Sequence, residues 1–141
     1  MKHLRRSLFT VFLLSISLLI IGCSNEPTTE NYIAKVSDFE DNIFSSSQNQ
    51  SIGLREGELR VSGIYDKEAK IKTSLDDIIS TISLENGDQR VKTFSNVKIT
   101  TDKDKYTITA DDGINLVFTK VGKRIIKDEK GVEYRTAKQP E

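Results

Sequence analysis

From residue 52 onward, apolar side chains recur at every second position within short segments of the chain. Val97 and Ile99 alternate with polar residues in this way, and Tyr106, Ile108 and Ala110 do so in the next segment. Residues two positions apart lie on the same face of a β-strand, so each segment predicts a strand with one buried and one solvated face. The same alternation occurs in residues 59–65, 69–73, 114–118 and 132–134.

Short turn signals separate these predicted strands. Glu56-Gly57, Asn86-Gly87 and Asp112-Gly113 favour tight hairpins, because the residues of such pairs tolerate a positive φ angle. Asp102-Lys103-Asp104 and Lys130-Gly131 indicate two further turns. A succession of short strands joined by hairpins predicts a mostly β fold built as an antiparallel meander. A small barrel and a sandwich both fit this pattern.

The segment before the strands has a different period. Spacings of four, three and four separate its apolar residues, which are Tyr32, Val36, Phe39 and Ile43. This spacing is typical of one face of an α-helix. We therefore predict one short N-terminal helix at about residues 30–45, which would cover one face or end of the sheet. The composition of Ser45–Ser51 predicts a loop after it.

One segment fits either a helix or a strand. Leu75, Ile78, Ile79 and Ile82 have helical spacing, but several residues between 75 and 84 are β-branched and Asn86-Gly87 follows directly. We favour a strand that pairs through this turn, with a helix as the alternative.

The N-terminus has the features of an export signal. Lys2, Arg5 and Arg6 are followed by a nearly apolar run from Leu8 to Ile21. This run has about 14 residues, fewer than the roughly 20 that a helix needs to span a bilayer. A basic start, a short apolar run and a small residue at its end indicate a signal peptide.

The run ends in Ile20-Ile21-Gly22-Cys23, which resembles the lipobox of bacterial lipoproteins. The resemblance covers about the first 23 residues. It implies transfer of diacylglycerol to the Cys23 thiol, cleavage between Gly22 and Cys23, and a membrane anchor of acyl chains such as palmitate. The implied location is the extracytoplasmic face of the cell membrane. Richness in Lys, Ile, Asn and Ser favours a Gram-positive envelope, with a Gram-negative one as the alternative.

These features divide the chain into four predicted parts. Residues 1–22 are the signal peptide that is removed, and residues 23–31 are a lipidated tether containing Pro27. Residues 32–136 form a single β-rich domain, whose family the sequence does not identify. Residues 137–141 are a frayed tail.

The mature chain lacks most reactive side chains. His3 and Met1 lie in the signal peptide, Cys23 is the sole cysteine, and the chain has no tryptophan. A Ser-His-Asp or Cys-His catalytic site, a zinc site of Cys and His, and haem ligation by His, Met or Cys are therefore excluded. We expect neither enzymatic activity nor a cofactor.

The charge of the mature chain gives no reason to expect a nucleic-acid partner. Residues 1–22 hold three of the 21 basic residues and none of the 21 acidic ones, so residues 23–141 carry 18 basic and 21 acidic residues. Nucleic-acid binding usually requires a clustered basic face, which this balance does not suggest.

Three local features remain as candidate sites. Asp102, Asp104, Asp111 and Asp112 lie at turns on opposite ends of one predicted strand, which favours solvated turn residues over a calcium site. The segment Ile114–Val121 is apolar on both faces, which indicates a central buried strand or, alternatively, the wall of an apolar ligand cavity. The basic stretch between Lys120 and Lys130 indicates a solvated hairpin face, with contact to anionic headgroups as the alternative.

The predicted location outside the cytoplasm and the exclusion of the common catalytic sites together favour a non-catalytic binding module. This module would be tethered to the membrane through Cys23. Its partner would be another envelope protein, a peptide or a small apolar ligand. One alternative is an immunity or exclusion factor that intercepts a toxin, peptide or phage component. Another is a pheromone precursor, in which a peptide from the signal segment carries the function.

Overall fold

The computed structural model describes residues 31–84 and 87–137. The predicted signal peptide, Gly22, Cys23, most of the tether and residues 138–141 lie outside these ranges. The described elements in chain order are η1 (Val36–Asp38), β1 (Ile43–Ser46), β2 (Gln50–Arg55), β3 (Glu58–Gly63), α2 (Asp76–Thr81), β4 (Arg90–Phe94), β5 (Lys98–Asp102), β6 (Lys105–Ala110), β7 (Ile114–Gly122), β8 (Ile125–Asp128) and β9 (Glu133–Thr136).

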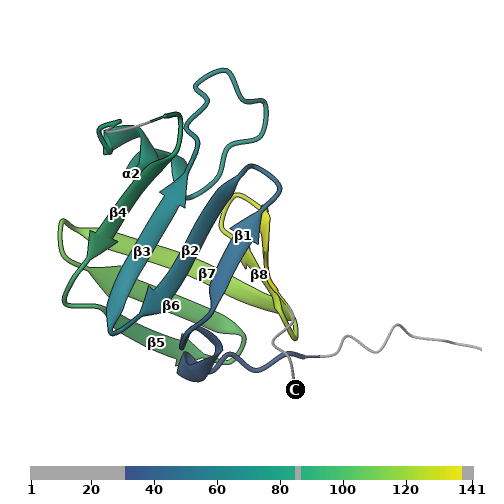
Figure 1. Ribbon diagram of the computed structural model, residues 1–141. Coiled ribbons are helices and arrows are strands. Elements are labelled where there is room, and N and C mark those ends of the chain that lie inside the picture. Colours follow the sequence, from purple (N-terminus) through teal and green to yellow (C-terminus); the bar gives the residue numbers. More distant parts are fainter. Residues whose placement is uncertain (1–30, 85–86, 138–141) are drawn as a thin grey trace, which may run out of the picture. The chain divides into compact units, whose positions relative to one another are not determined.

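The strands form one nine-stranded antiparallel sheet in the order β4-β3-β2-β1-β9-β8-β7-β6-β5. It consists of two meanders, β1–β4 and β5–β9, which are joined because the first strand pairs with the last. The sheet curls into a half-barrel, so that β2, β3 and β4 cross over β5, β6 and β7 in Figure 1. The predicted mostly β antiparallel fold is confirmed.

Hairpin turns form where the sequence predicts them. Glu56 and Gly57 join β2 to β3 with φ angles of 54° and 79°, and Asp112 and Gly113 join β6 to β7 with φ angles of 59° and 74°. Such paired positive φ angles match the twist of the flanking strands, which explains why these dipeptides fix the strand register.

The prediction of an N-terminal helix at 30–45 is wrong. The segment contains only the single turn η1, and β1 begins at Ile43. The helical spacing is a coincidence, because Phe39 is buried whereas Val36 and Ile43 are exposed, so these residues do not share a buried face. Of the loop predicted at Ser45–Ser51, residues 47–49 form the turn between β1 and β2, whereas the residues on either side belong to these strands.

The preferred strand at 75–84 is wrong as well, because α2 occupies this segment. Leu75 and Ile79 are fully buried at helical spacing. The guanidinium group of Arg90 donates hydrogen bonds to the carbonyl oxygens of Ile79, Ser80 and Ile82, at 3.2, 2.9 and 2.9 Å. The bonds to Ser80 and Ile82 satisfy carbonyls at the end of the helix, where intrahelical partners are lacking, so tertiary contacts outweigh the β-branched composition.

The strand predicted at residues 69–73 is not formed either. Residues 64–75 are an irregular connection from β3 to α2, in which Ile71 is exposed and Thr73 is buried. Thr73 is held by polar partners rather than by a strand ladder, since its backbone N–H donates to Asp76 Oδ2 at 2.8 Å.

Aromatic rings fill the interior of the half-barrel. The ring of Phe39 lies 4.9 Å from that of Phe44 and 5.2 Å from that of Tyr106, measured between centroids. Phe118 and Tyr134 pack edge to face at 5.5 Å. These are favourable aromatic geometries, and they join Phe39, directly after η1, with residues of both meanders and of the β1–β9 junction in one core.

A buried carboxylate fastens the long connection to the sheet. Asp128, 5% exposed, accepts hydrogen bonds from the backbone N–H groups of Ser74, Lys130 and Val132 at 2.7, 3.0 and 2.8 Å. The Tyr134 hydroxyl donates to the same carboxylate at 3.2 Å. One acidic side chain thus holds together the β8–β9 turn, β9 and the start of the α2 region.

Replacing this carboxylate should destabilise the domain more than replacing an exposed one. Asp128→Ala leaves several buried donors without partners, and we expect a loss of about 3 kcal/mol in the free energy of unfolding. Replacing the exposed Asp102 at the end of β5, as Asp102→Ala, should change it by less than about 0.5 kcal/mol. Urea unfolding followed by circular dichroism measures both values. Equal effects of the two substitutions would contradict the role assigned to Asp128.

Candidate functional site

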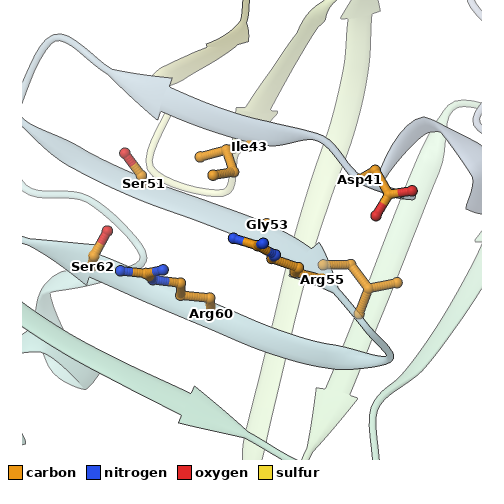
Figure 2. Close-up of a pocket in the computed structure, with 8 residues that line it drawn as sticks. Asp41, Ile43, Ser51, Gly53, Arg55, Arg60 and Ser62 are labelled. Carbon is orange, nitrogen blue, oxygen red and sulfur yellow. The ribbon is translucent and has the colours of Figure 1, made fainter.

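A hollow of about 410 Å³ lies on the outer face of β1, β2 and β3. In Figure 2 the ribbons of these strands run beneath its labelled side chains. Its lining combines hydroxyl, guanidinium, carboxylate and apolar groups, from Asp41, Ile43, Ser51, Gly53, Leu54, Arg55, Arg60 and Ser62. This mixture of an apolar surface with a few charged groups is typical of a ligand site.

The hollow exists because the residues at its floor are small. Gly53 pairs with Ile43 on β1 and with Arg60 on β3. A Cβ atom at Gly53 would lie 2.6 Å from the carbonyl oxygen of Asn42, so no side chain fits there without shifting β1. Ser51 and Ser62 oppose each other in the next pair of this face and also project little.

Charge in the hollow is predominantly positive. Arg60 is exposed, and no ion pair or hydrogen bond of its guanidinium group is found among the described residues. Arg55 has only a loose, exposed contact with its neighbour Glu56, at 3.8 Å. Asp41 provides one negative charge at the rim. Both guanidinium groups therefore remain available to an anionic group of a ligand, which they would bind through charge-assisted hydrogen bonds.

A second polar cluster lies where the N-terminal segment joins the sheet. Asp38 Oδ2 accepts hydrogen bonds from Lys120 Nζ at 2.7 Å, from the Tyr106 hydroxyl at 2.5 Å and from the backbone N–H of Lys35 at 2.9 Å. The side chains of Asp38 and Lys120 are only 21% and 11% exposed. We call Asp38, Tyr106 and Lys120 the latch, because they bind η1 to β6 and β7.

The latch perturbs the ionisation of its own members. Burial opposes ionisation of Asp38, but the hydrogen bonds from Lys120, Tyr106 and the Lys35 backbone outweigh it, so the pKa of Asp38 is lowered. Burial, together with the hydrogen bond to Asp38 and its charge, raises the pKa of Tyr106 far above its ordinary value. Tyr106 therefore stays a phenol at neutral pH and is not available as a base. The cluster is built to hold the structure together.

The structure separates the carboxylates at the two predicted turns. Asp112 forms an ion pair with Lys92 at 2.7 Å, and both carboxylate oxygens of Asp111 accept from Asn96 Nδ2, at 2.9 and 3.0 Å. These bonds connect the β6–β7 turn to β4 and to the 95–97 loop, where the two edges of the sheet meet. Within residues 31–84 and 87–137, no group of three or more His, Cys, Asp or Glu side chains is arranged to hold a metal ion.

The apolar segment Ile114–Val121 lies within β7, between β6 and β8. Ile114, Leu116 and Phe118 face the packed core. The basic stretch between Lys120 and Lys130 spans the end of β7, β8 and the following turn, and Lys120 at its start belongs to the latch.

Sequence inspection missed the hollow and the latch. Arg60 and Gly53 are opposite partners in the β2–β3 hairpin, so extending the predicted Glu56-Gly57 hairpin outward would have paired them. Nothing local could have revealed the latch, because Asp38 lies 68 residues from Tyr106 and 82 residues from Lys120.

Comparison with known proteins identifies no relative. No family model, no curated protein and no solved structure matches this chain. Among the residues that the structure describes, no helix is long and apolar enough to cross a membrane.

The latch should make stability depend on pH in the acidic range. Because the pKa of Asp38 is lower in the folded state, its contribution is complete above the unfolded-state pKa and is lost as the pH falls through the folded-state pKa. We expect the melting temperature to fall below about pH 4, and Asp38→Asn to flatten this dependence. Thermal melts across this range measure it, with Asp102→Asn as an exposed control. A wild-type slope retained in Asp38→Asn would refute this assignment.

Two tyrosines should resist alkaline titration. Burial raises the pKa values of both Tyr106 and Tyr134, and Asp38 and Asp128 respectively add to the effect. Their contribution to stability is therefore complete below about pH 10 and is lost at higher pH. Absorbance titration at the phenolate band should show a late phase that coincides with alkaline unfolding. The double variant Tyr106→Phe/Tyr134→Phe should lack this phase, and its persistence there would contradict the assignment.

Proposed function

We propose that this protein is a non-catalytic binding module, anchored to the extracytoplasmic face of the cell membrane through lipidated Cys23. We further propose that its ligand is a protein or peptide segment that presents a carboxylate beside an apolar side chain. The observation that carries the ligand proposal is the pair Arg55 and Arg60 in the lining of the hollow. Arg60 has no ion pair or hydrogen bond of its guanidinium group among the described residues, and Arg55 has only the exposed contact with Glu56 at 3.8 Å.

The chemistry of the hollow supports this class of ligand. Guanidinium groups bind carboxylates through two parallel hydrogen bonds, and the hydroxyl groups of Ser51 and Ser62 supply further donors. Ile43 is 53% exposed beside them, and it offers an apolar contact. Asp41 at the rim would repel a ligand that is negatively charged along its whole length, which favours a single carboxylate next to an apolar group.

The anchor would make a shallow site effective. The proposal of an anchor rests on the basic start, the short apolar run and the sequence Ile20-Ile21-Gly22-Cys23. A domain held at the membrane meets partners there at a high effective concentration, so a modest intrinsic affinity suffices. A protective role against a toxin or phage component would use the same hollow, and the identity of the captured partner would distinguish the two roles.

Photo-crosslinking in living cells tests the ligand site. A photoreactive residue in place of Ser62 lies in the hollow, and one in place of Thr100 lies on the exposed strand β5. We expect Ser62 to capture a specific envelope partner and Thr100 to capture none. Adducts of the same kind at both positions, or none at Ser62, would refute the proposal.

Charge reversal provides the matched control. Arg60→Glu should abolish the adduct at residue 62, because it replaces the proposed carboxylate-binding group with a repelling one. Lys98→Glu makes the same change of charge on an exposed residue of β5 and should leave the adduct intact. Cys23→Ala should reduce the adduct without changing the fold. An adduct that survives Arg60→Glu would contradict the assignment of Arg60.

A further inference from the structure

We infer that the surface where the tether enters the domain lies against the membrane. We call this surface the root face, and we define it by Tyr32, Ile33, Val36 and Lys103. The inference goes beyond the proposed binding site, and it rests on the proposed anchor at Cys23. The occupant is the lipid surface itself rather than a protein.

Exposed apolar side chains mark the root face. Ile33 is 67% exposed and Val36 is 40% exposed, although both lie next to the buried residues Ala34 and Phe39. A hollow of about 400 Å³ includes Ile33 in its lining, together with Asn31, Tyr32, Lys103 and Asp104. Clustered exposed apolar groups are a signature of a surface that contacts a partner or a membrane.

The root face is held rigidly. The backbone N–H of Ala34 donates to the carbonyl oxygen of Lys103 at 2.7 Å, and Lys120 Nζ donates to the carbonyl oxygen of Ile33 at 3.1 Å. Asp38 then binds Lys120 at 2.7 Å. The backbone at Ile33 is therefore fixed to the sheet from both sides. Figure 1 shows η1, in dark blue, at the end of the half-barrel beside β5.

The length of the tether favours the membrane as the occupant. Nine residue steps separate Cys23 from Tyr32, which reach about 30 Å when fully extended. The root face is the part of the domain closest along the chain to the anchor, so it would spend most time near the lipid.

The polar residues around Ile33 and Val36 also suit a lipid surface. Lys35, between them in the sequence, is exposed, and so is Lys103, which lines the hollow with Ile33. Lysines next to an anionic membrane surface are attracted to its headgroups, while neighbouring apolar side chains enter the interface. Asp104 at the edge of the hollow limits this attraction, so we expect shallow contact that depends on the anchor.

Single tryptophans test the inference directly, because the chain has none of its own. Cys23 is the sole cysteine, so the chain from residue 23 onward can be coupled through it to a maleimide phospholipid in vesicles of phosphatidylglycerol and acyl-brominated phosphatidylcholine. Ile33→Trp places a probe on the root face. Ile71→Trp places one at an exposed isoleucine of the 64–75 connection, as the matched control.

We expect the fluorescence of Ile33→Trp to be blue-shifted and mostly quenched by the bromine, while that of Ile71→Trp is nearly unchanged. Equal quenching at both positions, or no quenching at residue 33, would overturn the inference. A shift at residue 33 that occurs without quenching and depends on protein concentration would indicate contact with a second copy and also overturn it. Chemical coupling makes the test independent of whether cells lipidate Cys23, so failure of the proposed anchor would be seen separately, as an unmodified mass.

Discussion

Pairing of β1 with β9 brings the first strand of the fold beside the last, and the rest of the structure depends on it. Every other pair in the described sheet joins strands that are neighbours in the sequence, whereas this pair sets Phe44 opposite Thr136. This pairing closes a loop that contains most of the domain. Closing the loop costs chain entropy, which packing of the core must offset. The core does so because the junction unites the two meanders around one cluster of aromatic rings. Without the pair, each meander would expose its own apolar face to water.

The same architecture explains why the outer face of β1–β3 can carry small residues. The inner face receives the large aromatic and aliphatic side chains, so the outer face of β1–β3 can carry serine and glycine without loss of core volume. The long connection between β3 and β4 is secured by Asp128 and Asp76 away from this face. The latch fixes the entry of the chain at one end of the sheet. Aromatic rings fill the interior, so the proposed ligand site lies on the outer surface.

Much of the β structure could be predicted from the sequence, because alternation and hairpin signals are local. Glu56-Gly57 and Asp112-Gly113 formed the turns that their φ preferences indicate. The predictions of a helix at 30–45 and of a strand at 75–84 were wrong because contacts between distant parts of the chain decide these segments. Phe39 is buried by rings from other strands, and α2 is held at its end by Arg90 from β4. Asp111 and Asp112 were correctly placed at a turn, but their partners Asn96 and Lys92 depend on how the sheet edges meet.

The central claim is that the domain acts from a lipid anchor at Cys23. The basic start and short apolar run before Cys23, and the absence of histidine and of any other cysteine after residue 22, are consistent with this account. Intact mass spectrometry of the protein isolated from cell membranes tests it most directly. The account predicts a chain that begins at Cys23 and carries the added mass of a diacylglyceryl group. A chain that begins at another residue, or an uncleaved chain with an unmodified Cys23, would contradict it.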